Sequence, residues 1–308
     1  MNPKEIASKE SRFVGGHRFC SGCAVPSMMK QILASVDDVV VANATGCLEV
    51  ASTVYPFTSW KVPWIHSLFE NAPATVSGIE RAYRSLKRKG MVKKDIKFLA
   101  IGGDGSSYDI GLQSLSGALE RGHDFVYVAY DNQGYMNTGN QRSSATPFCA
   151  NTTTTPVGKA SQGKPQFRKN LTEICAAHRI PYVAQTAVHA YWDLTEKMKK
   201  AFANTPSVVV ILSPCVVNWG ITPDMTMQMS KLAVETCYWP MYEVENGKYK
   251  VNFKPPEKKP IEEFLKNQAR FKHLMKEDKK ALVQEIQSYT DREWERLLRL
   301  EKFSQVSD

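Results

Sequence analysis

Apolar runs alternate with amphipathic stretches through most of the chain, and this alternation predicts the order of its secondary structure. Compact apolar runs are typical of buried strands, and apolar residues at helical spacing are typical of helices packed on a sheet. Strands are predicted at residues 39–42, 97–101, 125–130, 182–186 and 207–212, and helices at 26–34, 71–89, 110–121, 171–178 and 191–203. This order favours an α/β fold, a doubly wound and mainly parallel sheet in which the last of these runs is the last core strand.

Two loops and a tail interrupt the alternation. Residues 55–66 are rich in proline and tryptophan and are predicted to form a loop. Residues 135–170 are predicted to form a polar loop that is too long for a simple connector, which favours a functional role. Toward the C-terminus the composition becomes charged, and residues 261–300 have amphipathic helical character. We therefore predict one α/β domain over residues 1–254 and a charged helical extension over 255–308, packed against the core or a partner subunit.

Length and charge narrow the class of protein. The chain has 308 residues, of which 43% are hydrophobic, and this is enough to bury one substantial core. The sequence has no apolar run that could span a bilayer and no apolar stretch of a signal peptide at its N-terminus. We therefore expect a cytoplasmic location and no membrane partner. The net charge of +9 comes without a basic face that carries aromatic platforms. That pattern argues against a nucleic-acid partner and suits an acidic electron carrier better.

Two polar turns follow neighbouring predicted strands. The first is Gly103-Asp104-Gly105, after the strand at 97–101, and the second begins at Asn132. Their separation leaves room for one crossover helix between parallel strands, so both turns are expected at the same edge of the sheet, where ligands bind. A carboxylate and an amide are hard oxygen donors that suit Mg²⁺, and the glycines let a diphosphate approach the backbone. This arrangement resembles the diphosphate and magnesium signature of thiamine diphosphate enzymes.

Four of the seven cysteines have positions that favour a metal centre. Cys20 and Cys23 form a Cys-x-x-Cys turn, which brings two thiolates near enough for one centre. Cys47 follows the first predicted strand and Cys215 the last, at the edge expected to carry Asp104. Zinc is an alternative to a redox centre here, and a thioredoxin-like pair fits less well because the motif does not follow a strand. The remaining thiols are interpreted as buried structural residues: Cys149, Cys175 and Cys237.

Several stretches of the chain carry a family resemblance. They are GHRFCSGC at 16–23, NATGCLEV at 43–50, WKVPWIHSLFEN at 60–71, GGDGSSYDIG at 102–111 and YDNQGYMNTG at 130–139. Together they closely resemble the β subunits of the 2-oxoacid:ferredoxin oxidoreductase family, and among these the subunits of the pyruvate enzymes. The resemblance runs from about residue 11 to residue 245.

The resemblance implies a thiamine diphosphate-binding fold in the domain over 1–254 and a ligand set for each cofactor. It implies that a 4Fe–4S cluster beside thiamine diphosphate is held by Cys20, Cys23, Cys47 and Cys215. It implies that Mg²⁺ is held by Asp104, Asn132 and the backbone carbonyl of Gly134. The expected diphosphate cradle adds Gly103 and Gly105, and the residue expected near the reacting carbon, in a catalytic role, is Asn137.

The resemblance also implies the reaction and the partners. The expected activity is oxidative decarboxylation of pyruvate with coenzyme A to acetyl-CoA and CO₂, or the reverse, with electrons passing through the cluster to ferredoxin. The chain supplies only the diphosphate-binding half of a thiamine site and has no ferredoxin-type cysteine run. An α subunit and a ferredoxin-like subunit of the same complex are therefore expected. An oxalate oxidoreductase, a non-redox thiamine diphosphate decarboxylase and a cofactor-free structural subunit remain alternatives.

Some positions depart from the family pattern or allow two interpretations. Many relatives have Cys-Gly-Glu or Cys-Gly at the second cysteine, where this chain has Cys23-Ala-Val. The departure leaves the substrate less defined than the class of reaction. His17 and His66 are interpreted as structural residues rather than as the acid–base group. Thr138 and Ser143, in the long loop, either line the pocket or cap turns.

Overall fold

The computed structural model describes residues 8–305. The N-terminal segment used to argue against a signal peptide therefore lies largely outside the described residues. Within them, eight strands form one sheet in the order β2-β1-β3-β4-β6-β5-β7-β8. The strands are β1 (Val39–Ala44), β2 (Trp64–Ser67), β3 (Lys97–Gly103), β4 (Val126–Asp131), β5 (Tyr182–Ala187), β6 (Ser207–Leu212), β7 (Tyr242–Glu245) and β8 (Lys248–Val251). The first six strands run parallel to one another, and β7 and β8 add an antiparallel edge beside β5, so the predicted α/β class is confirmed.

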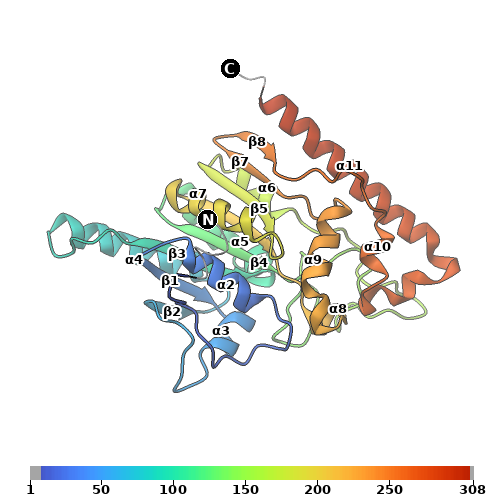
Figure 1. The fold of residues 1–308 in the computed structure, drawn as a ribbon, viewed down its shortest axis with the longest axis horizontal. Helices are drawn as coiled ribbons and strands as arrows, with labels where there is room; N and C mark the ends of the chain where they lie inside the picture. Colours follow the sequence, from blue (N-terminus) through green and yellow to red (C-terminus); the bar gives the residue numbers. More distant parts are fainter. Residues whose placement is uncertain (1–7, 306–308) are drawn as a thin grey trace.

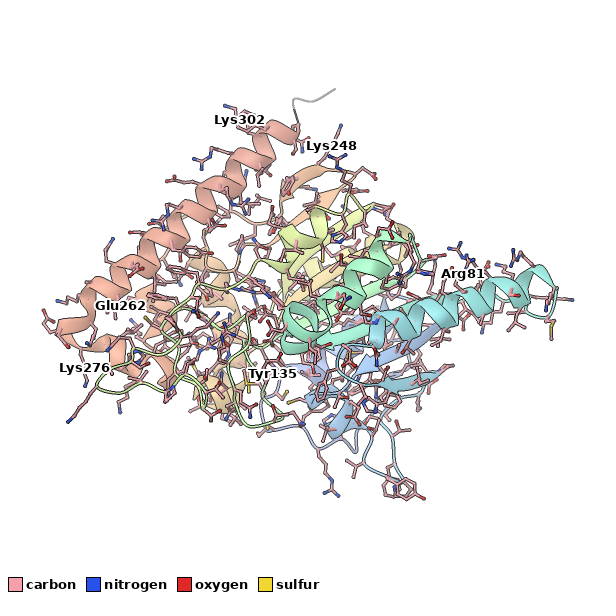
Figure 2. The ribbon with its side chains drawn as sticks, turned by 180° about the vertical axis from the view of Figure 1, so that it is seen from behind. Arg81, Tyr135, Lys248, Glu262, Lys276 and Lys302 are labelled. Atoms are coloured by element: carbon pink, nitrogen blue, oxygen red, sulfur yellow. The ribbon has the colours of Figure 1, made fainter. Side chains whose placement is uncertain are left out.

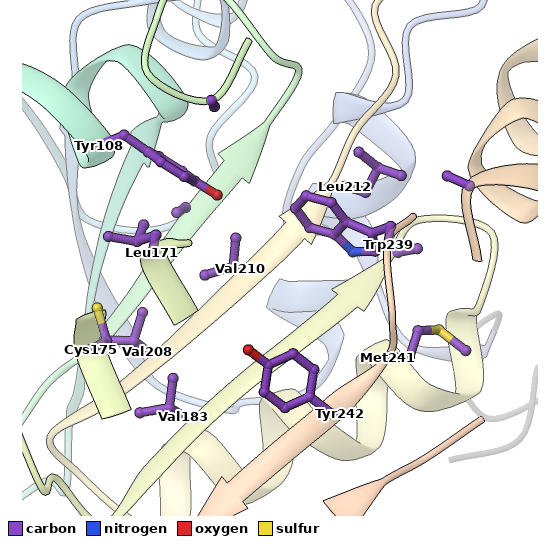
Figure 3. Close-up of a cluster of buried hydrophobic side chains, with 14 of the residues drawn as sticks. Tyr108, Leu171, Cys175, Val183, Val208, Val210, Leu212, Trp239, Met241 and Tyr242 are labelled. Carbon is purple, nitrogen blue, oxygen red and sulfur yellow. The ribbon is translucent and has the colours of Figure 1, made fainter. Parts of the chain in front are cut away.

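Helices cover both faces of the sheet (Figure 1). Alternate strand residues point to opposite faces, which builds two separate buried clusters. One cluster receives α2 (Val25–Ala34) and α7 (Tyr191–Ala203). The other receives α4 (Ala72–Arg88), α5 (Leu112–Glu120) and α6 (Leu171–Ala176); Figure 2 shows α4 and α5 from that side, and Figure 3 shows part of this cluster around β5 and β6. The parallel strands are thus buried on both sides, as their continuous apolar sequences require.

The structure corrects the sequence prediction at four places. The expected loop at 55–66 runs into a short strand, β2, which pairs with β1 at the sheet edge. The run at 207–212 is not the last strand, because β7 and β8 follow it. The helix expected at 110–121 begins as a π-helical turn at Gly105–Ile110, before α5. Further helices were not predicted: α3 (Cys47–Ser52), α8 (Val216–Trp219) and α9 (Thr226–Glu235).

The C-terminal extension is less continuous than predicted. It begins with α10 (Glu262–Leu265) and two 3₁₀ turns, Ala269–Met275 and Glu277–Lys279, before the long α11 (Lys280–Ser304). Phe264 and Phe271 are buried in the same cluster as Val208 of β6, so the extension packs on the sheet. The domain boundary at 254/255 stays a prediction. Among residues 8–305, the helices include none that is long and apolar enough to cross a membrane.

Candidate functional site

The site lies at the carboxyl edge shared by four parallel strands, β1, β3, β4 and β6. In the register of β3 and β4, Gly103 pairs with Tyr130, so Asp104 and Asp131 follow as neighbours. Asp131 in turn pairs with Leu212, the last residue of β6, three positions before Cys215. The strand ends therefore bring the polar turns and the thiol-bearing segments of the sequence to one edge.

Asp104, Asn132 and Gly134 line a small cavity of about 40 Å³, which we call the oxygen cavity. Asp104 is 1% exposed, and its carboxylate accepts hydrogen bonds from the backbone N–H of Asn132 at 3.2 Å and from the Ser143 hydroxyl. The NH₂ group of the Asn132 side chain donates to Asp104 Oδ1 and to the Gly134 carbonyl, each at 2.8 Å. The carboxylate, the amide and the carbonyl are therefore within reach of one another. If the amide turned its oxygen inward, the three groups would supply the oxygen donors that a hard cation prefers.

Glycines give this cavity its shape, most clearly at Gly105 and Gly134. A Cβ at Gly105 would lie 2.2 Å from the ring of Tyr135, and one at Gly134 would lie 2.8 Å from the side chain of Met136. Both glycines line the cavity, together with Gly103. The backbone can therefore approach a ligand here as closely as a diphosphate requires.

Two buried carboxylates meet behind the oxygen cavity. Burial raises the pKa of Asp104 well above its usual range, the neighbouring Asp131 raises it further, and the bonds from Ser143 and Asn132 oppose the shift. Burial also raises the pKa of Asp131, while Arg168 lowers it. A cation bound at the oxygen cavity would favour the ionised form of Asp104.

Cys20, Cys23, Cys47 and Cys215 line a second cavity of about 450 Å³, which we call the thiol cavity. The backbone N–H of Cys23 donates to the carbonyl of Cys20 at 3.0 Å, so these two residues form a tight turn, while Cys47 opens α3 and Cys215 precedes α8. Much of the lining is apolar: Phe19, Val25, Val50, Val54, Pro214 and Val216. In the described part of the chain, no three His, Cys, Asp or Glu residues form a group that could hold a single metal ion.

Burial controls the protonation of the thiols. It raises the pKa of Cys23 to about 11 and that of Cys47 to about 12, with smaller contributions from the neighbouring thiols, and it also raises the pKa of Cys215. The three thiols therefore keep their protons at neutral pH, and a metal centre that binds them must displace these protons. The remaining cysteines do not line this cavity and are buried elsewhere: Cys149, Cys175 and Cys237.

The two cavities share part of their lining. Cys47, Asn132 and Asn137 border both of them. Asn137 is exposed, and its side chain makes no hydrogen bond to another described residue. A group that fills one cavity would therefore lie directly beside a group that fills the other, with Asn137 between them.

The other candidate residues divide between the cavity and its surroundings. Thr138 lines the oxygen cavity and also accepts a 2.7 Å hydrogen bond at its carbonyl from Gln141, while Ser143 donates to Asp104 from outside the lining. His17 stacks on Phe13, with ring centroids 6.0 Å apart, and lines neither cavity. His66 lines neither cavity, and its Nε2 lies 2.6 Å from the Thr45 hydroxyl, which belongs to the oxygen cavity.

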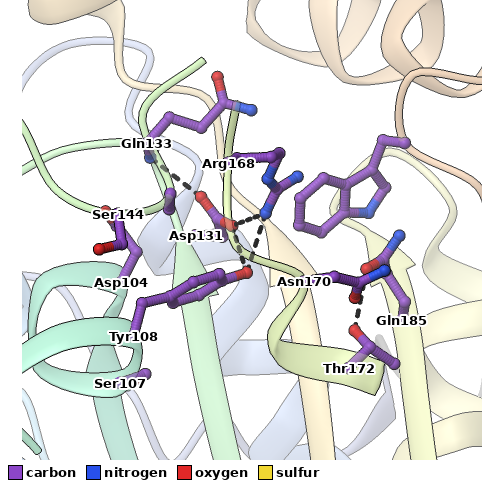
Figure 4. Close-up of polar contacts among 12 residues, drawn as sticks. Asp104, Ser107, Tyr108, Asp131, Gln133, Ser144, Arg168, Asn170, Thr172 and Gln185 are labelled. Carbon is purple, nitrogen blue, oxygen red and sulfur yellow. Dashed lines mark hydrogen bonds and ion pairs between the residues drawn. The ribbon is translucent and has the colours of Figure 1, made fainter. Parts of the chain in front are cut away.

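Sequence reasoning missed the network behind the oxygen cavity. Tyr108 donates to Asp131 Oδ2 at 2.6 Å, and Arg168 Nη2 lies 2.5 Å from the same oxygen (Figure 4). Two positions after Asp131, Gln133 Oε1 accepts a hydrogen bond from Arg270 at 2.5 Å. Asp131 could have been predicted to belong to the site, because it directly precedes Asn132, a predicted magnesium ligand. Arg168 stands in the long loop and Arg270 in the C-terminal extension, and neither position has a sequence pattern that points to the site.

Comparisons with known proteins identify the relatives of this chain. A family model described as "Thiamine pyrophosphate enzyme, C-terminal TPP binding domain" matches residues 44–211. The pyruvate synthase subunit PorB of Thermotoga maritima is 52% identical over 307 residues, covering 97% of this chain and 95% of its own. The PorB subunit of Methanocaldococcus jannaschii is 49% identical, covering 92% of this chain and 95% of its own.

More distant relatives extend the comparison. The ketoisovalerate oxidoreductase subunit VorB of Pyrococcus abyssi is 41% identical and covers 94% of each chain. Among solved structures, a 2-oxoglutarate:ferredoxin oxidoreductase from Magnetococcus marinus matches with a TM-score of 0.56 and 23% identity, over 70% of this chain and 68% of that one. At that identity the structural match supports the fold alone.

Proposed function

We propose that this chain binds thiamine diphosphate and an iron–sulfur cluster side by side at the carboxyl edge of the sheet. The chain belongs to the thiamine pyrophosphate enzymes and, within them, to the family of the PorB and VorB subunits. It is the β subunit of a 2-oxoacid:ferredoxin oxidoreductase. The observation that supports the proposal is the common border of the two cavities at Cys47, Asn132 and Asn137.

Magnesium fits the oxygen cavity. The Asn132 amide lies within 2.8 Å of both Asp104 Oδ1 and the Gly134 carbonyl, and it can turn its oxygen toward a cation. Asp104 is buried and forms no ion pair with another described residue. We assign these three as the magnesium ligands, with Gly103 and Gly105 beside the diphosphate. In this assignment Asp104 holds the metal, the Ser143 hydroxyl fixes the orientation of its carboxylate, and the glycines keep side chains away from the phosphates.

A 4Fe–4S cluster fits the thiol cavity. Four thiols border an apolar space of about 450 Å³, which is larger than a single ion needs. We assign Cys20, Cys23, Cys47 and Cys215 as its ligands. The chemistry supplied by the two cofactors when bound is electron acceptance as CO₂ leaves the 2-oxoacid, followed by one-electron transfer. The apolar lining of the cavity excludes water, and Cys47 places the cluster next to the thiamine site.

Asn137 is the residue of this chain proposed to act on the substrate. Its unpartnered amide borders both cavities, where it can donate a hydrogen bond to the substrate or to the charge that develops during its reaction. Pyruvate is the proposed substrate because two relatives near 50% identity are pyruvate synthase subunits. The VorB relative at 41% identity makes a branched 2-oxoacid the second candidate.

The chain works as one subunit of a larger complex, because its relatives are named as subunits. We propose an α subunit that completes the thiamine site, a ferredoxin-like subunit, coenzyme A as acyl acceptor and ferredoxin as electron acceptor. A cytoplasmic location stays a prediction.

The testing experiment is anaerobic purification of the intact complex, followed by analysis of iron, sulfide and thiamine diphosphate and by turnover with several substrates. Pyruvate, oxalate, 2-oxoglutarate and 2-oxoisovalerate are compared under one set of conditions. Pyruvate is expected to give the fastest coenzyme A-dependent reduction of the acceptor. Reduction with oxalate alone would overturn the substrate assignment and keep the cofactors. Zinc in place of iron and sulfide would overturn the proposed iron–sulfur cluster. Absence of thiamine diphosphate would overturn the proposed function and favour a cofactor-free structural subunit.

A further inference from the structure

Two arginines contact the proposed metal-binding loop Asp131–Gly134 in similar settings: Arg270 is buried, and Arg168 is 12% exposed. Arg168 lies 4.4 Å from the ring centroid of Trp239, and Arg270 lies 4.1 Å from that of Trp219. Each donates one hydrogen bond of 2.5 Å to a side chain of the loop, Arg168 to Asp131 and Arg270 to Gln133. Two side chains of the loop are thus each held by an arginine that stacks on a tryptophan.

The two arginines differ in charge balance. Arg168 forms an ion pair with Asp131. Arg270 is 2% exposed, and its hydrogen bonds go to the neutral amides of Gln133 and Gln268, the second at 2.8 Å. Its Nη1 has no hydrogen-bond partner, and it forms no ion pair with any residue in the range 8–305. A buried charge without a counter-charge is strongly unfavourable, and burial accordingly lowers the pKa of Arg270 to about 9.

The position of Arg270 shows which side of the site its charge faces. Trp219, on which it stacks, belongs to α8, and the Trp219 backbone N–H donates to the carbonyl of Cys215 at 3.0 Å. The indole N–H of the same tryptophan donates to the carbonyl of Asn132 at 2.9 Å. Arg270 therefore lies against the helix that follows one proposed cluster ligand. The groups that interact with its charge are, in decreasing order, Tyr238, Cys215, Asp131 and Asp104.

We propose that Arg270 supplies the internal counter-charge of the iron–sulfur cluster and raises the cluster's reduction potential; this inference rests on the proposed function. Four thiolates give a 4Fe–4S cluster a net negative charge that grows by one electron on reduction, so a fixed positive charge nearby stabilises the reduced form more. Arg18 also borders the thiol cavity but is exposed, where water and salt screen its charge. A partner subunit cannot contact Arg270, because the guanidinium is buried within this chain.

The test is a redox titration of the assembled, anaerobically purified complex. The midpoint potential of the cluster is measured from the EPR signal of its reduced form. The signal is assigned to this chain by its change in Cys215→Ser. We expect the loss of one buried unit charge near the cluster to change the reduction equilibrium constant roughly tenfold, because water and salt screen such a charge only weakly. Arg270→Gln is therefore expected to lower the potential by about 59 mV, the equivalent of tenfold for one electron.

A second variant neutralises the same charge without removing the arginine. In Gln268→Glu, a carboxylate replaces the amide that accepts from Arg270 Nε, and the buried charge gains an internal partner. The potential is expected to fall as in Arg270→Gln. The control is Gln268→Met, which also loses the hydrogen bond to the Phe264 carbonyl, loses the one from Arg270 Nε in addition, and adds no charge. It is expected to keep the wild-type potential.

The outcomes separate the inference from the function on which it rests. A fall in both charge variants, with Gln268→Met unchanged, supports the inference. An unchanged potential in a cluster-loaded Gln268→Glu complex overturns it, and so does an equal fall in Gln268→Met, because packing rather than charge would then be the cause. If Cys215→Ser leaves iron and the EPR signal intact, the proposed cluster itself is wrong.

Discussion

The oxygen cavity and the thiol cavity lie at one edge of one sheet and share three lining residues, yet they are built in opposite ways. The oxygen cavity is small, and its central acid, Asp104, is already oriented by hydrogen bonds from Asn132 and Ser143. The thiol cavity is about ten times larger and mainly apolar, and its buried thiols hold their protons. The chain therefore preorganises the proposed diphosphate and metal site by polar contacts. The other side is an apolar cavity, and in the proposed function it takes its final geometry only when the cluster binds.

This contrast predicts that the two sides can be damaged separately, and the largest effect is expected at Asp104. Asp104→Ala removes the only carboxylate assigned to the metal, and the loss of affinity for thiamine diphosphate should exceed the ten- to hundredfold that outer-shell changes cost. Cofactor binding to the assembled complex, measured by calorimetry, is expected to fall below detection, while iron content stays at the wild-type value.

Asn132→Ala provides the graded comparison at the same site. It removes a neutral ligand and keeps the carboxylate, so binding should weaken less than in Asp104→Ala. Normal cofactor content in a folded Asp104→Ala complex would contradict the metal assignment. Loss of iron together with the cofactor would contradict the separation of the two cavities.

The second prediction concerns the thiol cavity. Cys20 and Cys215 line this cavity and not the oxygen cavity. Each of Cys20→Ser and Cys215→Ser should strongly reduce iron and sulfide content, because a serine hydroxyl is a poor ligand for iron–sulfur clusters. Thiamine diphosphate binding is expected to remain. The matched controls are buried cysteines away from the cavity, Cys149→Ser and Cys175→Ser, which should keep full iron. Full iron in Cys215→Ser would remove that residue from the ligand set.

The strand edge explains why much of this site could be predicted from sequence. Asp104, Asn132, Cys47 and Cys215 each stand just beyond an apolar strand, and parallel strands bring such positions together whatever lies between them. The same reasoning fails for β2, because Trp64–Ser67 is a short, half-exposed edge strand without an apolar run.

Arg270 shows a second limit of sequence reasoning. It meets Gln133 across 137 positions of the chain, and the C-terminal segment that carries it has no pattern of its own that points to the metal loop. Its place is set by the burial of Phe264 and Phe271 against the sheet. Contacts of this kind depend on the packing of side chains far apart in sequence, and local periodicity carries no information about them.

The third prediction concerns the border between the cavities. Asn137 is not among the ligands assigned to magnesium or to the cluster, so Asn137→Ala should leave iron and thiamine diphosphate contents unchanged. Turnover with pyruvate should fall by about a hundredfold, the size typical of losing one preorganised donor at a developing charge. Steady-state assays on the assembled complex measure this directly. A wild-type rate would remove Asn137 from the chemistry, and a loss of either cofactor would make its role structural.

The smallest effect is expected from a methyl group placed inside the preorganised side. In Gly105→Ala the new Cβ would lie 2.2 Å from the ring of Tyr135. The Tyr135 hydroxyl donates to the Gly105 carbonyl at 3.1 Å and to Asp109 at 3.3 Å, so the ring must move and shift the start of the loop that carries Asn137. Overpacking of this kind costs about 1–3 kcal/mol, and we expect roughly tenfold weaker binding of thiamine diphosphate with unchanged iron.

Gly158→Ala is the control, since no atom lies within 4 Å of its added Cβ, and this variant should bind thiamine diphosphate as the wild type does. Equal binding in both variants would mean that the oxygen cavity adapts to its ligand, and the contrast between a preorganised and a cofactor-dependent side would then fail.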